Sequence, residues 1–493
     1  MGAQLSSLNL SSLKHVHIIG VCGTLMGSFA AYLKRQKIRV TGSDQNIYPP
    51  MSDVLKQAGV ELLGGYQKEN LSFLGQKPDL VVIGNVIRAD NPEARAAIDE
   101  NYVYGSLPEV MENLLLQNTR NLVVAGTHGK TTTSSLLAHI LVQAGLSPSY
   151  FIGGVSQDLP NSFHVSDVHR SSSASTAHSL FVLEGDEYDT AFWDKVPKFN
   201  HYCPDDVILT SVEYDHADIY PDFQAVYRAF EGLVRRIRPQ GRLIACVDWE
   251  SVSQLIRSAS VPVITYGSRP QANAQFTPAQ VRFEQGLSFF EILEGQKKVA
   301  EIELQIPGMH NVLNALSAWI EARQLGVNES VIAHALKTFR GVKRRQEIRG
   351  EVGGVLVIDD FAHHPTAVRE TLRALRAKYP SRRLIPIFEP RSATSRRKIF
   401  QKEYAQAFEE ADLIFIASPF DQSRIVREEQ FSSDALAQDL IQMGRKAWVF
   451  QEVDDGVQSV LQQVRKNDVI AVLSNGGFGG FIPKLLKALE ATS

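Results

Sequence analysis

The feature that most constrains the fold is a short glycine-containing segment between two apolar ones. The run NLVVA (121–125) has the composition of a buried strand, and it leads directly into GTHGKTTT (126–133). The apolar stretch SSLLAHILVQAG (134–145) follows at once and is typical of a buried helix. A strand, a glycine turn and a helix in immediate succession predict a parallel α/β sheet with the turn at its carboxyl edge.

The residue types in this turn predict a phosphate-binding loop. Glycines let backbone N–H groups point at phosphate oxygens, and the helix N-terminus adds a partial positive charge. We expect Lys130 to reach the terminal phosphates of ATP and the Thr131 hydroxyl to ligate Mg²⁺. The common form of the loop has a glycine at the place of Val124, so this chain has a shortened variant, G-T-H-G-K-T.

Composition narrows the class of protein and its partners. A chain of 493 residues predicts two to four domains, and a net charge of 51 − 54 = −3 gives no bulk attraction to nucleic acid or membranes. The cysteines Cys22, Cys203 and Cys246 are spaced neither for zinc nor for a disulfide framework. No apolar run reaches the roughly 20 residues that span a bilayer. We therefore expect a cytoplasmic protein without nucleic-acid or membrane partners.

Strand-like and helical runs alternate along nearly the whole chain, which predicts α/β architecture with parallel sheets in three domains. Residues 1–118 are expected to form a disordered leader and a Rossmann-like domain, and residues 119–343 a P-loop domain. Residues 344–493 are expected to form a second Rossmann-like domain. Its strand candidates are 355–360, 383–388, 413–418, 447–450 and 469–474.

A Ser/His-rich segment, residues 158–179, interrupts the second domain. Its composition predicts a mobile surface insertion. His164, His169 and His178 lie in it, and we interpret them as solvated loop residues rather than metal ligands.

Two acidic clusters follow later strands of the P-loop domain. Glu184 lies in LEGDEYD (183–189), and Asp215 and His216 lie in VEYDHAD (212–218). Open α/β sheets bind ligands at the carboxyl ends of their strands, so both clusters belong beside the phosphate loop. Thr131 and Glu184 would supply two hard oxygen ligands for Mg²⁺, whereas His216 is a softer ligand for a second ion.

The order of the motifs GTHGKTTT, EGDEYD, YDHAD, GMHNVLNALSA and DDFAHHP resembles that of the Mur ligase family. The resemblance covers nearly the whole chain and implies a cytoplasmic, Mg²⁺-dependent, three-domain enzyme of peptidoglycan metabolism that uses ATP to join a carboxylate to an amine. VCGTLMG, GSDQNIYPPMS, FNHYCPDD, FEPRSATS and SNGGFGGF resemble the branch that joins UDP-N-acetylmuramate to the tripeptide L-alanyl-γ-D-glutamyl-meso-diaminopimelate. The branch that adds L-alanine is the alternative, and an ATP-hydrolysing nucleotide switch is a second one.

The matched motifs imply which residues serve ATP and catalysis. Phosphate, adenine and interdomain nucleotide contacts are implied for Gly126, Thr127, His128, Gly129, Lys130, Thr131, Thr132, His310, Asn311, Asn314, Arg345, Asp360 and His363. The implied catalytic residues are Lys130, Glu184 and His216, and the implied metal ligands are Thr131, Glu184 and His216. Either His216 or His363 could deprotonate the amine.

The glycine turn GVCGTLMG (20–27) would by itself suggest NAD, because it is similar to a dinucleotide-binding fingerprint. The family resemblance reassigns it to the UDP part of UDP-N-acetylmuramate. The implied contacts are Gly20, Cys22, Gly23, Thr24, Met26, Gly27, Asp44 and Asn85.

The third domain is implied to bind the peptide through Arg391, Asn475 and Gly476, which follow strand candidates. The Arg391 guanidinium could hold a peptide carboxylate through two parallel hydrogen bonds. Several family members carry a carbamylated lysine where this chain has Phe230, so we predict that the modification is absent. We expect a monomer.

Overall fold

The computed structural model describes residues 5–48, 51–73, 75–166 and 179–492. These residues fall into two compact units. The first consists of Met1–Glu213, Gln224–Phe276 and Leu316–Ala335, and the second of Tyr214–Phe223, Thr277–Ala315 and Leu336–Ser493.

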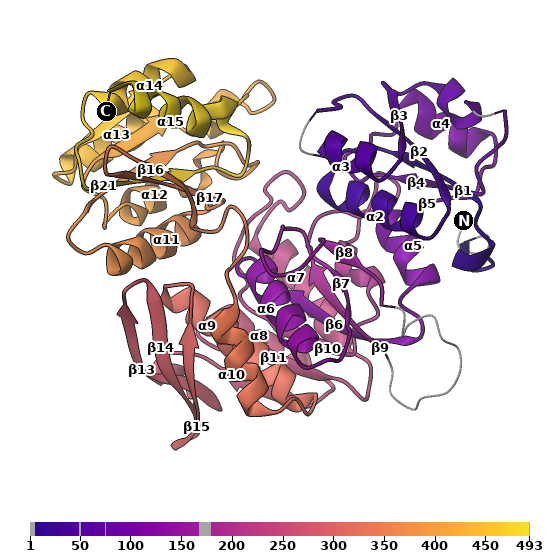
Figure 1. Ribbon diagram of the computed structural model, residues 1–493, viewed down its shortest axis with the longest axis horizontal. Helices are drawn as coiled ribbons and strands as arrows, with labels where there is room; N and C mark the ends of the chain where they lie inside the picture. The colour runs from indigo at the N-terminus through magenta and orange to yellow at the C-terminus, as the bar shows by residue number, and fades with distance from the viewer. Residues whose placement is uncertain (1–4, 49–50, 74, 167–178, 493) are drawn as a thin grey trace. The chain divides into compact units, whose positions relative to one another are not determined.

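The N-terminal part of the first unit is a five-stranded sheet with the order β3-β2-β1-β4-β5 (Figure 1). All neighbouring strands are parallel, which is the doubly wound arrangement that we expected. The strands are β1 (His15–Ile19), β2 (Arg39–Asp44), β3 (Glu61–Gly64), β4 (Leu80–Ile83) and β5 (Tyr104–Ser106). The helices are α2 (Thr24–Arg35), α3 (Met51–Gln57), α4 (Pro92–Asp99) and α5 (Leu107–Leu114).

The prediction of a disordered leader is wrong from Leu5 onward. Leu5 is buried, and its side chain fills the space beside the backbone of Gly105, where a Cβ atom would lie only 2.7 Å from it. A 3₁₀ turn at Leu10–Ser12 follows, capped by the Asn9 side chain. One apolar side chain therefore anchors a segment whose overall composition is polar. Residues 1–4 lie outside the described residues.

The central part of the first unit has the strand order β12-β11-β10-β6-β9-β7-β8 (Figure 1). β6 lies between β9 and β10 and is parallel to both. The strands are β6 (Thr119–Ala125), β7 (Ser149–Phe151), β8 (Phe163–His164), β9 (Ser179–Gly185), β10 (Asp206–Leu209), β11 (Arg242–Cys246) and β12 (Val263–Tyr266). The helices are α6 (Lys130–Gln143), α7 (Phe223–Arg235) and α8 (Glu250–Leu255).

The described part of the Ser/His-rich segment is not a surface loop. β8 pairs antiparallel with β7, and Phe163 is fully buried among aromatic rings that include Phe29 and Phe151. His164 lies in this strand beside Tyr150. The prediction of a mobile surface insertion is therefore wrong for Phe163, which forms part of the core. His169 and His178 lie outside the described residues.

The second unit contains two groups of strands. One group has the strands β13 (Phe276–Glu284), β14 (Leu287–Glu294) and β15 (Lys297–Leu304). β14 and β15 pair antiparallel, which our prediction of parallel sheets did not include. The other group has the order β16-β17-β21-β18-β19-β20. Its strands are β16 (Glu347–Val352), β17 (Val355–Asp360), β18 (Arg383–Phe388), β19 (Ile414–Ala417), β20 (Ala447–Phe450) and β21 (Asp468–Leu473).

The five predicted strands of this sheet are present as β17 to β21, and β16 is an additional antiparallel edge strand. Its helices are α11 (Pro365–Lys378), α12 (Gln401–Ala407), α13 (Ser433–Gln442), α14 (Val453–Leu461) and α15 (Phe481–Thr492). Helices α9 (Met309–Gln324) and α10 (Glu329–Thr338) each contain residues of both units. Further 3₁₀ turns are Lys68–Ser72, Lys198–His201, Ile256–Ser258, Pro270–Ala272, Lys398–Phe400, Arg427–Glu429 and Phe478–Gly480.

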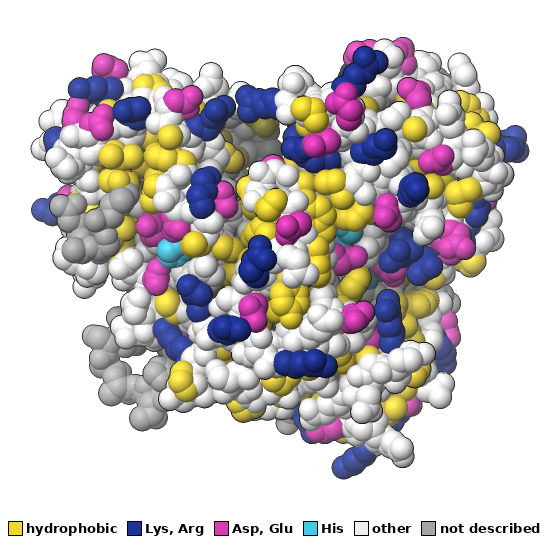
Figure 2. All heavy atoms as spheres, turned by 180° about the vertical axis from the view of Figure 1, so that it is seen from behind, with side chains coloured by type: hydrophobic (Ala, Val, Ile, Leu, Met, Phe, Trp, Pro, Cys, Tyr) yellow, Lys and Arg dark blue, Asp and Glu magenta, His cyan; other side chains and the backbone are white. Residues whose placement is uncertain are grey.

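The surface agrees with the balanced composition. On the face shown in Figure 2, Lys and Arg side chains are interspersed with Asp and Glu side chains, and the described residues there form no broad area of one charge. Among the described residues, every helix is too short or too polar to cross a bilayer.

His201 ties α5 to the loop after β9 within the first unit. Its Nδ1 lies 2.7 Å from Glu112 Oε2, and its Nε2 lies 2.7 Å from Asp194 Oδ2. Burial alone would lower the pKa of His201, but the hydrogen bonds and charges of the two carboxylates outweigh burial and raise it. A raised pKa in the folded state means that the imidazolium stabilises the fold below the unfolded pKa near 6.5.

We predict that His201→Gln lowers the thermal unfolding midpoint more at pH 6 than at pH 9. The stabilisation by the imidazolium is fully present at the lower pH and is lost as pH rises through the raised folded pKa. Calorimetric scans of the variant and the wild type at both values would measure the difference. An equal loss at pH 6 and pH 9 would contradict this role of the charge.

Candidate active site

The phosphate loop begins where β6 ends, and its shape depends on two glycines. Gly126 has a φ of 137°, and a Cβ atom there would lie 2.8 Å from Ser211 N and would clash with the Thr210 hydroxyl. Gly129, with a φ of 83°, occupies the position before α6 in the left-handed region. Both conformations favour glycine. Lys130 and Thr131 consequently form the first residues of α6, which begins four residues earlier than the helix predicted from Ser134.

The Lys130 ammonium is held by a buried carboxylate that the sequence did not single out. Its Nζ lies 2.7 Å from Glu187 Oε2 and also donates to the carbonyl of Gly126 at 2.7 Å. Burial opposes the charge of Lys130, but Coulomb attraction to Glu187 and Asp186 and the hydrogen bond to Glu187 outweigh burial and raise its pKa. Lys130 is therefore a cation enclosed by protein groups.

Thr131 and Glu184 form a pair of oxygen donors next to the loop. Thr131 Oγ1 donates to Glu184 Oε1 at 2.7 Å, and the Gly153 N–H donates to Glu184 Oε2 at 2.6 Å. Burial raises the pKa of Glu184, and the bonds from Thr131 and Gly153 oppose that rise only in part. A hydroxyl and a buried carboxylate whose charge lacks full compensation fit a hard divalent cation such as Mg²⁺.

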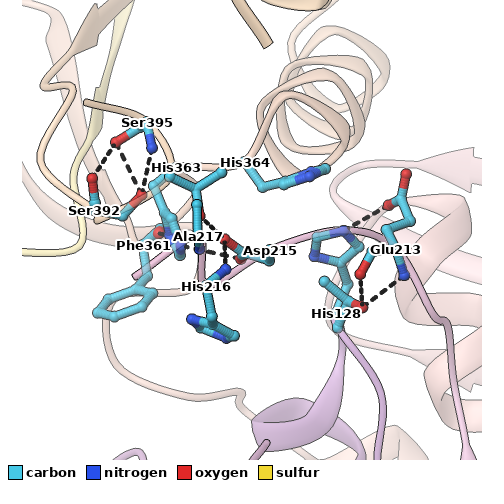
Figure 3. Close-up of polar contacts among 12 residues, drawn as sticks. His128, Glu213, Asp215, His216, Ala217, Phe361, His363, His364, Ser392 and Ser395 are labelled. Carbon is cyan, nitrogen blue, oxygen red and sulfur yellow. Dashed lines mark hydrogen bonds and ion pairs between the residues drawn. The ribbon is translucent and has the colours of Figure 1, made fainter. Parts of the chain in front are cut away.

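The middle of the loop is bonded to the segment that follows β10. The Thr127 N–H donates to the Ser211 carbonyl at 2.9 Å, and the His128 N–H donates to Ser211 Oγ at 3.0 Å. His128 Nε2 lies 2.7 Å from Glu213 Oε2, and the two side chains point toward each other in Figure 3. The side chain of His128 therefore positions the loop within the protein. Thr132, the last residue implied to contact phosphate, is buried in the first turn of α6.

The N-terminal glycine turn is held by Asp44. The Cys22 N–H donates to Asp44 Oδ2 at 2.9 Å, and the Asn46 N–H donates to Asp44 Oδ1 at 3.0 Å. Gly20 adopts a φ of 82°, so the turn requires a glycine there. Burial, with a smaller contribution from Asp44, raises the pKa of Cys22 to about 11, so its thiol stays protonated. Asp44 positions the turn, whatever further contact it makes.

The other residues predicted for this site begin or surround α2. Gly23 precedes the helix and Thr24 is its first residue. Met26 is buried, and Gly27 provides the space that Met51 fills, since a Cβ atom there would lie 2.8 Å from Met51 Cγ. Asn85 follows β4 and is exposed. The structure thus brings the glycine turn and Asn85 to strand ends of one sheet.

Asp215 is the centre of a polar cluster in the second unit (Figure 3). Its Oδ1 accepts bonds from the His216 N–H at 2.7 Å and from Thr394 Oγ1 at 2.5 Å. Its Oδ2 lies 3.8 Å from His363 Nε2. Burial opposes ionisation, but the neighbouring histidines and Thr394 outweigh it and hold the pKa of Asp215 well below its usual value. His216 itself has a φ of 56°, an uncommon conformation for this residue type.

His363 and Asp360 lie at the carboxyl end of β17. His363 Nδ1 lies 3.0 Å from the Phe361 carbonyl, which requires the proton on Nδ1 and leaves the lone pair of a neutral ring on Nε2. Burial lowers the pKa of His363, although Asp215 opposes that effect. Asp360 accepts backbone N–H groups from Gln346 and Ala362, both at 2.8 Å.

The Arg345 guanidinium lies over the Phe361 ring, 4.7 Å from the ring centroid. The carbonyl of the same Phe361 contacts His363 Nδ1. Its neighbour Arg344 contacts the same ring at 5.2 Å and donates to the carbonyls of Ser474 and Gly476 at 2.6 and 2.7 Å. Arg344 was not predicted. It connects the start of the third domain to the segment predicted to bind the peptide.

The segment predicted to contact adenine is the first turn of α9. Asn311 Nδ2 donates to the Pro307 carbonyl at 2.8 Å, and Asn314 Nδ2 donates to Asn311 Oδ1 at 3.4 Å. The ring of His310 packs against Gly308, where a Cβ atom would lie 2.8 Å from His310 Cε1. The two asparagines therefore also stabilise the start of the helix.

The residues predicted for peptide binding meet after β18 and β21. Arg391 packs its guanidinium on the Phe420 ring at 3.8 Å and lies so close to Gly476 that any side chain there would clash. Arg391 Nη1 lies 3.2 Å from Glu389 Oε1, and Glu389 is buried and also bonded by the Ser474 hydroxyl. The buried Oδ1 of Asn475 has no hydrogen-bond partner among the described residues.

The structure brings some predicted groups together and leaves others in separate units. Lys130, Thr131 and Glu184 are neighbours in the first unit, whereas His216 and the residues of the third domain belong to the second. Glu187 and Glu389 were missed. Both lie within motifs that the sequence did identify, EGDEYD and FEPRSATS. For Glu389, the nearby Arg391 in the sequence could have indicated an ion pair, whereas Lys130 is too far from Glu187 in the sequence to give such a signal.

Comparison with known proteins supplies the family. Sequence models of the Mur ligase family, catalytic domain, the Mur ligase middle domain and the Mur ligase, glutamate ligase domain match residues 15–119, 124–322 and 344–476. The chain is 39% identical, over 96% of its length and 98% of the relative's, to the UDP-N-acetylmuramate–L-alanyl-γ-D-glutamyl-meso-2,6-diaminoheptanedioate ligase of Escherichia coli (strain K12).

Two further relatives have lower sequence identity to this chain. A UDP-N-acetylmuramate–L-alanine ligase from Clostridium botulinum (strain Hall) is 29% identical over 94% of this chain and 95% of its own. The crystal structure of a murein peptide ligase from Psychrobacter arcticus 273-4 superposes with a TM-score of 0.72 at 34% identity, over 97% of this chain and 99% of that one. The chain therefore belongs to the Mur ligase family of ATP-dependent, amide-bond-forming ligases and has its three-domain α/β architecture.

Proposed function

We propose that this enzyme joins the tripeptide L-alanyl-γ-D-glutamyl-meso-diaminopimelate to UDP-N-acetylmuramate, with conversion of ATP to ADP and phosphate, in the recycling of murein peptide. The observation that carries this proposal is the 39% identity over 96% of the chain to a ligase of that specificity, against 29% to a ligase specific for L-alanine. We further propose that it works as a monomer in the cytoplasm, without nucleic-acid or membrane partners.

We propose that each of the three domains, with boundaries at 118/119 and 343/344, binds one of the three substrates. UDP-N-acetylmuramate binds the N-terminal domain at the glycine turn, with Asp44 and Asn85 nearby. ATP binds the phosphate loop of the central domain, and Arg345, Asp360 and His363 of the third domain contribute on closure. The peptide binds through Arg391, Asn475 and Gly476.

The proposed reaction must first activate the muramate lactyl carboxylate, which is a poor electrophile. A carboxylate resists attack by an amine because oxide is a poor leaving group, so the muramate lactyl carboxylate first attacks the terminal phosphoryl group of ATP. ADP leaves and an acyl phosphate forms. Lys130 and the loop N–H groups neutralise charge on the phosphoryl group during transfer. Mg²⁺, held by Thr131, Glu184 and His216, would supply further neutralisation of phosphate charge.

In the second step the L-alanine amine of the peptide attacks the acyl carbon, and phosphate leaves. The amine must lose a proton first. His363 fits the role of base better than His216, because its Nδ1 bond to the Phe361 carbonyl leaves the Nε2 lone pair available and burial lowers its pKa. A neutral imidazole at neutral pH can accept the proton.

The reaction itself tests the proposal. Purified enzyme with UDP-N-acetylmuramate and Mg²⁺-ATP should release phosphate with the tripeptide and form the amide product, and should do so poorly with L-alanine. Lys130→Ala should reduce the rate by roughly 10²–10³-fold, since one missing electrostatic contact of this kind costs roughly 3–4 kcal/mol of barrier. Phosphate release that ignores UDP-N-acetylmuramate would instead indicate a nucleotide switch, and preference for L-alanine would indicate the other ligase branch.

The Thr131–Glu184 pair generates a prediction about the metal. Glu184→Gln keeps the shape but removes the charge that a divalent cation needs, so the Mg²⁺ concentration for half-maximal activity should rise at least about tenfold. Titration of activity with Mg²⁺ at saturating ATP measures this. Thr131→Ser, which retains the hydroxyl, is the matched control and should stay near the wild type. An unchanged Mg²⁺ requirement in Glu184→Gln would remove Glu184 from the metal site.

The environment of Arg391 generates a prediction about the peptide. Its guanidinium is fixed by Phe420 and Glu389, so a peptide carboxylate can receive two parallel N–H bonds from it. Arg391→Lys keeps the charge but loses this geometry, and should raise the KM for the tripeptide about tenfold with little change in the KM for ATP. Steady-state kinetics with each substrate varied separately would measure both. An unaltered tripeptide KM would exclude the clamp.

A further inference from the structure

The contacts of Lys130 bear on how ATP enters the site. An ammonium has three N–H donors. Those of Lys130 meet the Gly126 carbonyl at 2.7 Å and both oxygens of Glu187, at 2.7 and 3.1 Å. Its side chain is 14% exposed and that of Glu187 is 2% exposed. The cation assigned to the terminal phosphates is thus already paired with a buried anion.

The other acidic groups of the EGDEYD motif have partners of their own. Glu184 is bonded by Thr131 and by the Gly153 N–H. Asp186 lies 2.6 Å from Lys198 Nζ. Each carboxylate of this strand end is therefore matched to a different donor, and Glu187 is the one matched to the phosphate-loop lysine.

We propose that Glu187 is an anionic placeholder for the ATP phosphates, which must displace it from Lys130 when ATP binds. The inference rests on the assignment of the phosphate loop to ATP made above. A terminal phosphate and the Glu187 carboxylate are both anionic acceptors for the N–H groups of Lys130 that point at Glu187. They therefore compete for Lys130, and the bonds to Glu187 are exchanged for bonds to phosphate.

The exchange predicts the direction in which the ATP affinity changes when the charge of Glu187 is removed. Removing one partner of a buried ion pair leaves the other charge uncompensated inside the protein. Removal of the Glu187 charge should therefore make ATP bind more tightly, because Lys130 no longer has an anion to leave. If Glu187 instead served only to orient Lys130 toward phosphate, the same change would weaken ATP binding. The two roles predict opposite results.

Glu187→Gln tests the direction of the change in ATP affinity, because it removes the charge with little change in the shape of the side chain. Isothermal titration of the full chain with Mg²⁺-ATP should give a Kd about tenfold lower than that of the wild type, as expected for a charge-assisted bond of roughly 1.5 kcal/mol. Titration with Mg²⁺-ADP should show a shift in the same direction. The affinity for AMP should be unchanged, because AMP has no phosphate at the terminal positions. Weaker or equal ATP binding in Glu187→Gln overturns the proposal.

Asp186→Asn is the matched control. It removes the same charge one residue away but leaves the contacts of Lys130 in place, so the Kd for ATP should change by less than about threefold. Equal tightening in this variant would assign the effect to bulk repulsion and overturn the proposal. Glu187→Asp keeps the charge on a shorter side chain and should give a Kd between those of the wild type and Glu187→Gln. It remains informative if Glu187→Gln fails to fold.

Lys130→Met separates this inference from the ATP assignment on which it rests. ATP should bind the wild type and bind Lys130→Met much more weakly. If Lys130→Met binds ATP as the wild type does, the loop assignment itself fails. If Lys130→Met loses binding while Glu187→Gln shows no tightening, only the placeholder role fails.

Discussion

The close backbone contact at Gly126 is the constraint on which the phosphate loop depends. β6 and β10 run parallel in register, with Val124 opposite Ile208 and Ala125 opposite Leu209, so the two chains leave the sheet side by side. Only a residue without a Cβ atom fits against Ser211 at that point. Ser211 then receives the N–H groups of the next two loop residues, and α6 begins immediately after the loop.

The other neighbour of β6 supplies the acids. β9 pairs with it so that Glu184 lies opposite Val124, which places the whole EGDEYD motif beside the loop. Several carboxylates at one strand end would repel each other and resist burial. The fold meets this requirement by giving each its own donor: Thr131 for Glu184, Lys198 for Asp186 and Lys130 for Glu187. Asp186 and Glu187 are therefore each paired with a lysine, whereas Glu184 is bonded to a neutral hydroxyl and its charge is not fully compensated.

Sequence patterns predicted what local periodicity determines and missed what depends on distant partners. The loop, the parallel strands next to it and the five strands from β17 to β21 were predictable because each is a short apolar run with clear boundaries. The strands β13 to β16 were not predicted, because β13, β15 and β16 contain charged residues and lack a continuous apolar run. Leu5 and Phe163 were assigned to disordered and mobile segments because single buried side chains are hidden in polar composition.

Side-chain partners were the least predictable part of the site. The types of residue at Lys130, Thr131 and Glu184 indicated a nucleotide and a metal before any contact was known. Glu187 and Arg344 acquire their importance from partners far apart in sequence, and Glu389 contacts both the nearby Arg391 and the distant Ser474. EGDEYD contains five acidic or polar candidates in six residues, and no periodicity distinguishes the one that lies against the lysine.

The same limit applies to substrate specificity. In the proposed mechanism the phosphate loop and its acids serve phosphorylation of the carboxylate, in which the amine takes no part, so they carry little information about the amine. In the function proposed above, groups of the third domain distinguish the peptide from L-alanine, and Arg391 is fixed there between Phe420, Glu389 and Gly476. L-alanine presents one carboxylate close to its amine, whereas the tripeptide carries further carboxylates several bonds away. A guanidinium locked by an aromatic ring and a buried acid can select for that distance, because it cannot follow a shorter substrate without losing its packing.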